Sequence, residues 1–316
     1  MIYCAGHSII SPLGEGTQAN IEAVRTGRSG LRLHTGRFAD VEPFCASLFM
    51  EPQMFVPLCI NAIQDAARHC SVPLDGKDTL FVLSTTKGDN LDLLSPAERI
   101  TAHFGNPNRP VVVSNACTSG VCAQITALRM LESGRYSHAV VIGCDLQSRF
   151  IVSGFQSFKA LSPEPCRPFT DGHKGLNLGE AAAAIIYTTL PSDGWQFQAG
   201  SIHNDANHIS APSRTGDGAY LCLKDVMQNT KSEDIMLIGV HGTGTLYNDD
   251  MELAALRRAG LENVPRSVLK PFFGHTMGAA GVLETIIGAL MLNNGIFIKM
   301  LSGFGGVNAA VRIKCV

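Results

Sequence analysis

The spacing of apolar residues along the chain alternates between the periods that define strands and helices. Short aliphatic runs predict strands before Pro12 and at 79–84, 111–113, 138–145, 181–190, 195–202, 235–240, 296–301 and 309–315. Apolar positions three or four residues apart predict helices at 17–26, 57–69, 95–104 with Ser95 as N-cap, 121–131, 219–228 and along 251–256. Residues 31–50 are expected to be irregular and 155–180 to be rich in loops. Two successive passages of this alternation, with no low-complexity linker, predict an α/β protein of layered sheets with helices between and outside them.

One cysteine, Cys117, stands where the strand at 111–113 gives way to the helix at 121–131. The N–H groups and the positive dipole end of a helix favour a thiolate, so we expect a lowered pKa and a nucleophilic Cys117. Free cysteines are more often small buried hydrophobes, and Cys122, inside the helix, is interpreted in that way. The polar residues that crowd around Cys117 favour the functional interpretation there.

Two histidines occupy matching settings in the second part of the chain. His241 directly follows the strand at 235–240, and the hydroxyls of Thr243 and Thr245 could fix its ring by hydrogen bonds. His275 lies in GHTMGAAG, whose glycines suit the close approach of a backbone or a ligand. A lone histidine is usually structural, but two in such similar settings indicate a function.

A cation and a carboxylate accompany the second histidine. Lys270 precedes His275 by five residues and is the cation nearest to it in the sequence. Glu284 lies among apolar positions of the helix that follows, where a carboxylate must be paired or exposed. We expect Glu284 to pair with Lys270.

Composition and charge exclude several classes of function. The 316 residues are 45% hydrophobic and carry a net charge of −2, without a Lys/Arg run, so no nucleic-acid partner is expected. The ten cysteines include no CxxC pair, and His203 and His208 lack further ligands, so neither a disulfide framework nor a metal site is expected. Phosphate-binding glycine motifs are also missing, which predicts no nucleotide cofactor. With no leader-like start and no long apolar run, we expect a cytoplasmic protein with reduced thiols and no membrane partner.

Taken together, five motifs resemble those of the β-ketoacyl-ACP synthases, the condensing enzymes of the thiolase superfamily, over nearly the whole chain. They are NACTSG, RPFTDGHKGLNLGEAAA, HGTGTLYNDDMELAAL, KPFFGHTMGAAGVLE and GFGGVNAA. The resemblance implies the five-layered αβαβα thiolase-like fold with two similar halves. We place the half that carries the nucleophile at 1–192 and the half that carries both histidines at 193–316.

The resemblance also implies an activity, 3-oxoacyl-[acyl-carrier-protein] synthase. In such an enzyme an acyl thioester acylates the cysteine, and malonyl thioester then loses carbon dioxide and condenses with the acyl group. By resemblance the catalytic residues are Cys117, His241, His275, Lys270 and Glu284, with Lys270 and Glu284 orienting the second histidine. Backbone N–H groups of Cys117 and Phe304 are expected to hold the oxyanion, and Thr243 and Thr245 to position the substrate. Neutral imidazoles are required, so activity should fall at acid pH.

The same resemblance implies partners and leaves alternatives open. The expected partners are an acyl carrier protein and a second copy, in a dimer that joins the first halves and buries the strand at 138–145, or a homologous subunit in its place. The alternatives are a CoA-dependent thiolase-like enzyme, a non-catalytic chain-length partner of a synthase, and a purely structural or binding protein of this fold. A second GxCxG-like site is not evident, and Cys117 argues against a non-catalytic subunit.

The sequence departs from the family pattern at three places. Compared with the familiar elongation synthases it lacks stretches before Cys117 and soon after it, where the family shapes its acyl tunnel and dimer surface. His173 and Lys174 replace the usual Arg-Asp, which should alter a structural ion pair. Residues 300–302 replace Asn-Ser-Phe, so that Ser302 is expected to widen the mouth of the pocket.

Overall fold

Two groups of strands with the same topology frame the molecule in residues 1–68, 70–172 and 174–315, which the computed structural model describes. The first group has the spatial order β1 (Ile2–Ser11), β9 (Ala181–Thr188), β7 (His138–Asp145), β5 (Thr79–Ser84), β6 (Val111–Val113). The second has the order β10 (Gln196–Asn204), β14 (Val307–Cys315), β13 (Gly295–Gly303), β11 (Ile235–Gly239), β12 (Arg266–Ser267). In both groups two antiparallel pairings are followed by two parallel ones. An antiparallel pairing of β1 with β10 joins the groups, and β2 (Gly14–Glu15) pairs with β1 at its other end.

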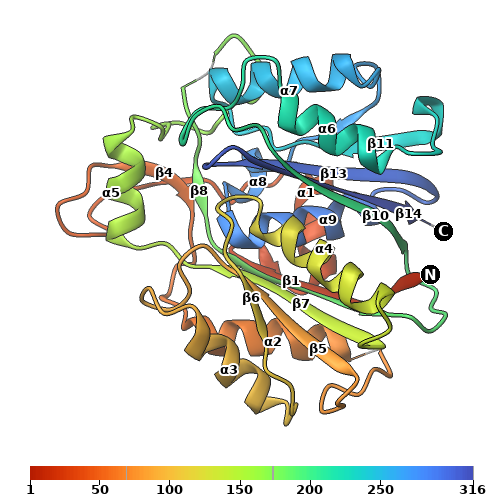
Figure 1. The fold of residues 1–316 in the computed structure, drawn as a ribbon. Helices are drawn as coiled ribbons and strands as arrows, with labels where there is room; N and C mark the ends of the chain where they lie inside the picture. The colour runs from red at the N-terminus through yellow and green to blue at the C-terminus, as the bar shows by residue number, and fades with distance from the viewer. Residues whose placement is uncertain (69, 173, 316) are drawn as a thin grey trace.

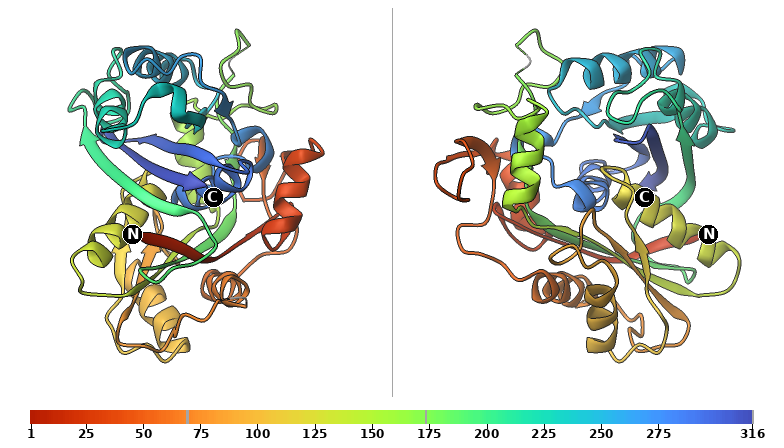
Figure 2. Two further views of the ribbon diagram at one scale, coloured as in Figure 1. Left: turned by 90° about the vertical axis from the view of Figure 1, so that its right-hand side faces the viewer. Right: turned by 60° about the vertical axis from the view of Figure 1, so that its left-hand side comes forward.

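Helices separate and cover the two groups of strands, as the sequence predicted (Figure 1). One outer layer contains α2 (Phe55–Ala67) and α3 (Leu94–His103), and the other contains α6 (Asp217–Val226) and α7 (Leu246–Arg258). Between the groups lie α4 (Ser119–Glu132) and α9 (Ala280–Leu290), so the order of layers is αβαβα (Figure 2). Separate apolar cores fill the spaces between successive layers. The helix α1 (Thr17–Arg25) lies beside β1 and α9.

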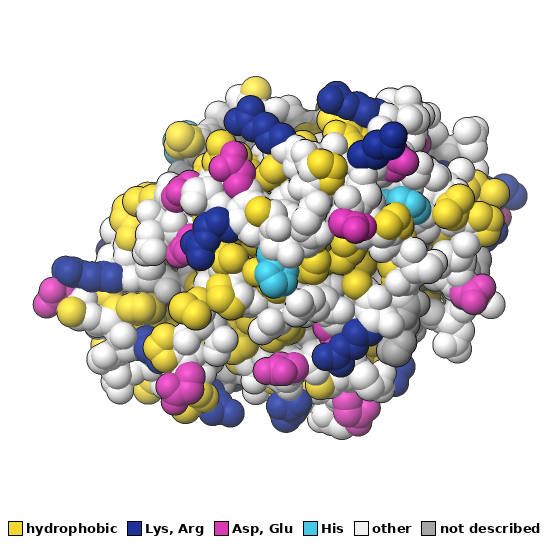
Figure 3. Space-filling model, turned by 90° about the horizontal axis from the view of Figure 1, so that it is seen from below, with side chains coloured by type: hydrophobic (Ala, Val, Ile, Leu, Met, Phe, Trp, Pro, Cys, Tyr) yellow, Lys and Arg dark blue, Asp and Glu magenta, His cyan; other side chains and the backbone are white. Residues whose placement is uncertain are grey.

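The outer layer of α2 and α3 presents a mixed surface. Figure 3 looks onto this side of the molecule and shows acidic and basic side chains interspersed among apolar ones. No helix in the described parts of the chain is both long enough and apolar enough to cross a bilayer.

The central helices α4 and α9 approach each other through glycines. A Cβ atom built on Gly120 would lie 2.8 Å from the Cα atom of Gly281 and 2.9 Å from the carbonyl oxygen of Gly278. Contacts that short do not occur between real side chains and backbone, so glycine is required at this crossing. The close packing fixes α4, which follows the candidate nucleophile, against α9, which follows the second candidate histidine.

Three details of secondary structure differ from the sequence-based expectation. Residues 31–50 are not wholly irregular, because β3 (Arg32–His34) and β4 (Phe44–Ser47) form a small sheet with β8 (Leu178–Gly179). The helix α5 (Arg149–Ser157) was not predicted. Ser95 does not cap α3, which begins one residue earlier; Asp92 Oδ1 instead accepts hydrogen bonds from the N–H groups of Leu94 and Ser95, each at 3.1 Å.

The expectation that a dimer would bury the strand at 138–145 is wrong in its choice of strand. That strand is β7, and both of its edges are already hydrogen-bonded, to β9 on one side and to β5 on the other. The outermost strand of the first group is β6, which pairs only with β5 among the described strands. An apolar run alone does not show whether a strand is central or at an edge.

Candidate active site

Cys117 stands at a tight turn between β6 and α4. The residue before it, Ala116, has φ of 48°, in the left-handed region that non-glycine residues seldom adopt. Hydroxyls hold the turn: Ser119 Oγ accepts from the N–H of Asn115 at 2.7 Å and donates to the carbonyl of Ala116 at 2.6 Å, while Thr118 Oγ1 donates to the carbonyl of Asn115 at 2.7 Å. The polar residues around the cysteine therefore build the elbow that presents it.

The fold brings three of the predicted site residues together. The sulfur of Cys117 and a ring nitrogen from each of His241 and His275 all lie within 4.8 Å of one another. The ring centroids of the two histidines are 5.0 Å apart, at an interplanar angle of 78°. All three side chains are buried. Groups this close could share a metal ion, so the expectation that none is bound stays a prediction.

Glu252 of α7, rather than the threonines, holds the segment of His241. Its carboxylate accepts hydrogen bonds from the N–H of His241 at 2.5 Å and the N–H of Gly242 at 2.7 Å. Thr243 Oγ1 and Thr245 Oγ1 bond to each other at 2.8 Å, and no described residue bonds to His241 Nδ1. The expectation that the threonine hydroxyls fix the ring is therefore wrong; backbone contacts place the histidine. Both threonines do line the cavity at the site.

His275 is held by its backbone as well. It follows the short helix α8 (Lys270–Phe273) and Gly274, whose φ of 66° and close approach to the carbonyl of Leu178 require glycine. The N–H of His275 donates to the carbonyl of Asn177 at 2.6 Å, and its carbonyl accepts from the N–H of Gly179 at 3.0 Å. Both ring nitrogens are buried and neither has a hydrogen-bond partner among the described residues, and the residue lines the cavity at the site.

Glu284 forms ion pairs with two buried lysines near the histidines. Lys270 Nζ pairs with Glu284 Oε1, as the sequence predicted, and Lys299 Nζ lies 2.6 Å from Glu284 Oε2. All three side chains are buried, and Lys299 is 0% exposed. Lys270 is therefore not the only cation at the site. No hydrogen bond joins Lys270 or Glu284 to the described atoms of the His275 ring, so they do not orient it directly.

Burial and positive charge keep both imidazoles neutral. Burial is the main cause that lowers the pKa of His241 well below its usual 6.5, and the charges of Lys270, His275 and Lys299 lower it further. The pKa of His275 is likewise well below the usual value, because of burial and then the two lysines. The lysines thus act on the rings through their charge.

The expectation of a lowered pKa for Cys117 is wrong. Burial raises the pKa of its thiol from 9.0 to about 11, although Lys270 and the backbone N–H groups of Phe304 and of Cys117 itself pull it down. The resting side chain is therefore a thiol. The same two N–H groups lie next to the sulfur. They are therefore close to the place where the carbonyl oxygen of a thioester would need hydrogen-bond donors.

A cavity of about 390 Å³ opens from the three reactive groups toward the surface. Its wall is largely apolar, with Phe155 of α5 stacked against Phe304 at a centroid distance of 6.1 Å. Ser302 lines the cavity where the family usually has Phe, and its hydroxyl donates to Asn308 Oδ1 at 2.6 Å. The apolar lining suits an acyl chain or a thioester arm.

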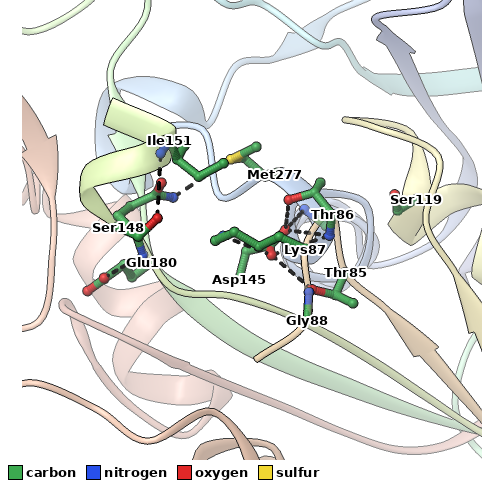
Figure 4. A network of polar contacts seen from close by, with 12 residues as sticks. Thr85, Thr86, Lys87, Gly88, Ser119, Asp145, Ser148, Ile151, Glu180 and Met277 are labelled. Carbon is green, nitrogen blue, oxygen red and sulfur yellow. Dashed lines mark hydrogen bonds and ion pairs between the residues drawn. The ribbon is translucent and has the colours of Figure 1, made fainter. Parts of the chain in front are cut away.

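Asp145, at the end of β7, ties several segments together behind the site (Figure 4). This fully buried carboxylate accepts from Thr85 Oγ1 at 2.9 Å, from Thr86 N at 3.0 Å and from Lys87 Nζ at 3.1 Å. It also accepts from the N–H of Gly278 at 2.7 Å, in the turn that leads into α9. The network fixes the loop after β5 against the segment that carries the second histidine.

One departure from the family pattern lies on the surface. Lys174 pairs with Glu164 at 2.9 Å, and both side chains are more than half exposed, so the pair contributes little to stability. His173 lies outside the described residues.

Comparison with known families agrees with this geometry. The family model described as beta-ketoacyl synthase, N-terminal domain, matches residues 87–191, and the one described as beta-ketoacyl synthase, C-terminal domain, matches residues 197–303. The chain belongs to the beta-ketoacyl synthase family. The two matches cover part of each group of strands, from β6 to β13 along the chain, and include Cys117, His241 and His275.

The chain aligns with only part of each curated relative. Nodulation protein E of Rhizobium leguminosarum bv. trifolii is 29% identical over 240 residues, which cover 72% of this chain and 58% of that protein. The 3-oxoacyl-[acyl-carrier-protein] synthase 2 of Rhizobium meliloti (strain 1021) is 33% identical over 229 residues, 66% of this chain and 54% of that protein. The chain thus spans a little over half the length of these relatives.

Solved structures of ketosynthases share the fold. One chain of the complex between a ketosynthase and its chain length factor from Xenorhabdus doucetiae superposes with a TM-score of 0.87 at 23% identity, covering 100% of this chain and 98% of that chain. A beta-ketoacyl synthase from Burkholderia phymatum STM815 gives a TM-score of 0.85 at 19% identity, with coverages of 100% and 99%. These identities show the thiolase-like fold alone.

The roles of two residues at the site, Glu252 and Lys299, were not identified from the sequence. Glu252 stands out in the sequence only as part of a motif, and Lys299 only as part of an apolar strand. The signal for Lys299 was available, because a lysine in the middle of IFIKML must be paired if the strand is buried. Its partner, however, lies on a different element and could not be identified from spacing.

Proposed function

We propose that the chain is a 3-oxoacyl-[acyl-carrier-protein] synthase, which joins an acyl thioester to malonyl thioester with loss of carbon dioxide. The observation that carries the proposal is the closeness of one thiol and two imidazoles, within 4.8 Å of one another at the inner end of an apolar cavity. The buried ring nitrogens without partners support it further, since such atoms are costly unless a ligand satisfies them.

The first half-reaction is acyl transfer to Cys117. As its sulfur attacks the thioester carbonyl carbon, the thiol proton passes to a neighbouring imidazole and from there to the departing carrier thiolate. The carbon–sulfur bond to the carrier breaks, and an acyl-cysteine remains. The N–H groups of Cys117 and Phe304 stabilise the oxyanion that forms on the way.

The second half-reaction uses the two histidines. Malonyl thioester loses carbon dioxide, and the electron pair of the broken bond becomes an enolate whose oxygen accepts hydrogen bonds from His241 and His275. The enolate carbon then attacks the acyl-cysteine, and Cys117 departs and regains a proton from solvent. Lys270, paired with Glu284, supplies positive charge next to the rings, in keeping with the low pKa of both.

The proposed partners are an acyl carrier protein, which would deliver both thioesters, and a second subunit. The relative named 3-oxoacyl-[acyl-carrier-protein] synthase 2 supports the carrier, and the ketosynthase solved with its chain length factor supports pairing with a like or homologous subunit. The edge strand β6 is the element we expect such a subunit to extend, because its outer side has no described strand beside it. We further propose that the halves divide at 192/193, between β9 and β10, and that the protein is cytoplasmic.

Variants at the three reactive residues test the proposal through its two half-reactions. Intact-mass measurement with a panel of acyl-ACPs should show one acyl group on the parent and on Cys70→Ala, a matched control at a half-buried cysteine, and none on Cys117→Ala. Cys117→Ala should still release carbon dioxide from malonyl-ACP. His241→Ala and His275→Ala should do the reverse, with at least partial acylation, because one imidazole remains in each, and decarboxylation lower by roughly 10²–10³.

Two results would contradict the proposal. A parent protein that neither takes up an acyl group nor releases carbon dioxide, but binds a homologous synthase, would indicate the chain-length partner instead. Acylation by acyl-CoA in place of acyl-ACP would move the assignment to the CoA-dependent class.

A further inference from the structure

A fully buried lysine, Lys299, lies inside a largely apolar strand. Lys299 lies in the middle of β13, where it pairs with Gly239 of β11 on one side and with Val311 of β14 on the other. It is 0% exposed. A buried ammonium group is costly unless several partners satisfy it, so its contacts should reveal why it is there.

The contacts of Lys299 converge on the segment that leads to His241. Its Nζ donates to the carbonyl of Val240 at 2.8 Å and to the carbonyl of Gly239 at 3.2 Å, and it lies 2.6 Å from Glu284 Oε2. These two carbonyls belong to the last residues before His241. The lysine therefore links the end of β11 to α9 of the central layer.

The backbone at His241 is consequently held from both sides. Lys299 binds the carbonyls of the two residues before it, and Glu252 accepts the N–H groups of His241 itself and of Gly242. No described residue bonds to Nδ1 of the ring, so the backbone and packing place the ring.

Room for the lysine depends on a glycine. A Cβ atom on Gly239 would lie 2.9 Å from Cδ of Lys299 and 2.9 Å from Cζ of Phe297. The β11 strand, otherwise apolar, thus has a glycine where the stem of Lys299 passes. Gly239 and Lys299 are thus directly paired across β11 and β13, and the side chain of Lys299 fits because Gly239 has no Cβ atom.

We propose that Lys299 is a positioning residue for His241, which it holds through the two preceding carbonyls, and that it also gives the cluster with Lys270 and Glu284 a net positive charge under both histidines. This inference rests on the proposed condensing function. The two lysines and one carboxylate sum to +1, and removal of Lys299 leaves zero. The charged and titratable groups around His241 are His275, Lys270, Lys299 and Cys117, together with Glu252, which binds its backbone N–H, and Glu284, which pairs with both lysines.

Lys299→Gln tests the inference, with Lys314→Gln, an exposed lysine of the adjacent strand β14, as the matched control. Acylation of Cys117 should be unchanged in both variants. Decarboxylation of malonyl-ACP by Lys299→Gln should fall by about 10- to 100-fold, because a displaced histidine donor costs factors of this size. The acid limb of its pH profile should also move to higher pH, since the charge of Lys299 lowers the pKa of both histidines.

Gly239→Ala is a second variant that displaces the lysine without removing its charge. It should reduce decarboxylation but move the acid limb less than Lys299→Gln does, because the charge stays near the rings. Unchanged decarboxylation and an unchanged acid limb in a folded Lys299→Gln protein would overturn the inference. A loss of acylation equal to the loss of decarboxylation would also overturn it, since that result means general damage. Failure of the proposed function differs from both, because the parent itself would then be inactive.

Discussion

The carboxylate of Glu252 offers a test of how the first histidine is held. It is 0% exposed and accepts two backbone hydrogen bonds, at 2.5 Å from His241 N and 2.7 Å from Gly242 N. Asn248 Nδ2 donates to it as well, at 2.9 Å. Glu252→Ala would remove the acceptor of two buried N–H groups at once.

The expected loss follows from the number of groups left without a partner. A buried donor without an acceptor costs about 1–3 kcal/mol, so two should lower the free energy of unfolding by about 2–6 kcal/mol. Glu252→Gln keeps one carbonyl oxygen and should lose about half as much. Glu262→Ala, an exposed glutamate just beyond α7, is the matched control and should lie within about 0.5 kcal/mol of the parent.

Equilibrium unfolding in urea, with the slope m compared among variants, measures these differences. A second signature comes from pH. Burial raises the pKa of Glu252 from 4.5 to about 7, against the pull of the N–H groups of Gly242 and His241. Because the folded pKa is the higher one, stability should fall as pH rises from 4.5 through 7 in the parent, and less so in Glu252→Gln. Equal stability of the parent and Glu252→Ala would refute the assignment.

Three further predictions follow from packing and charge. Alkylation of Cys117 by iodoacetamide should rise about tenfold per pH unit toward pH 11, since the thiolate is the reactive form; a plateau near pH 7 would contradict the raised pKa. Gly120→Ala should lower the free energy of unfolding by about 1–3 kcal/mol, whereas Gly154→Ala, with open space around it, should not lower it. Decarboxylation should stay constant as pH falls through 6.5, because the pKa values of His241 and His275 lie well below that; a midpoint at 6.5 would argue that a ring is exposed.

The sequence predicted the buried parts of the fold best. The strands at 79–84 and 138–145 have the predicted bounds, because strands covered on both faces are continuous apolar runs. The small sheet of β3, β4 and β8 was missed since its short strands pair with a segment far away in the chain, which no local pattern reveals. Sheet order, and with it the exposed edge at β6, likewise depends on pairing between distant segments.

The candidate site divides in the same way. Motif and turn chemistry are enough to single out Cys117, His241 and His275, because each stands at a glycine- or hydroxyl-rich turn beside a predicted strand or helix. The groups that hold them were not found, since Glu252 and Lys299 act across elements. Local sequence therefore identifies the reactive side chains, and the packing of layers decides which charges surround them.

The pKa of Cys117 shows how magnitude decides between two valid effects. A helix N-terminus stabilises a negative charge by up to about 2 kcal/mol, or about 1.5 pKa units. Full burial can raise the pKa of a thiol by up to about 3–5 units. Burial prevails here, with a pKa of about 11, even with Lys270 nearby.

Because both imidazoles are neutral, neither holds the thiol proton in the resting site, so in the proposed reaction deprotonation is coupled to arrival of the acyl group. A buried thiol of this kind is unreactive toward stray oxidants, which require the thiolate; in the proposed reaction it becomes a nucleophile only when the thioester carbonyl lies against the N–H groups of Cys117 and Phe304.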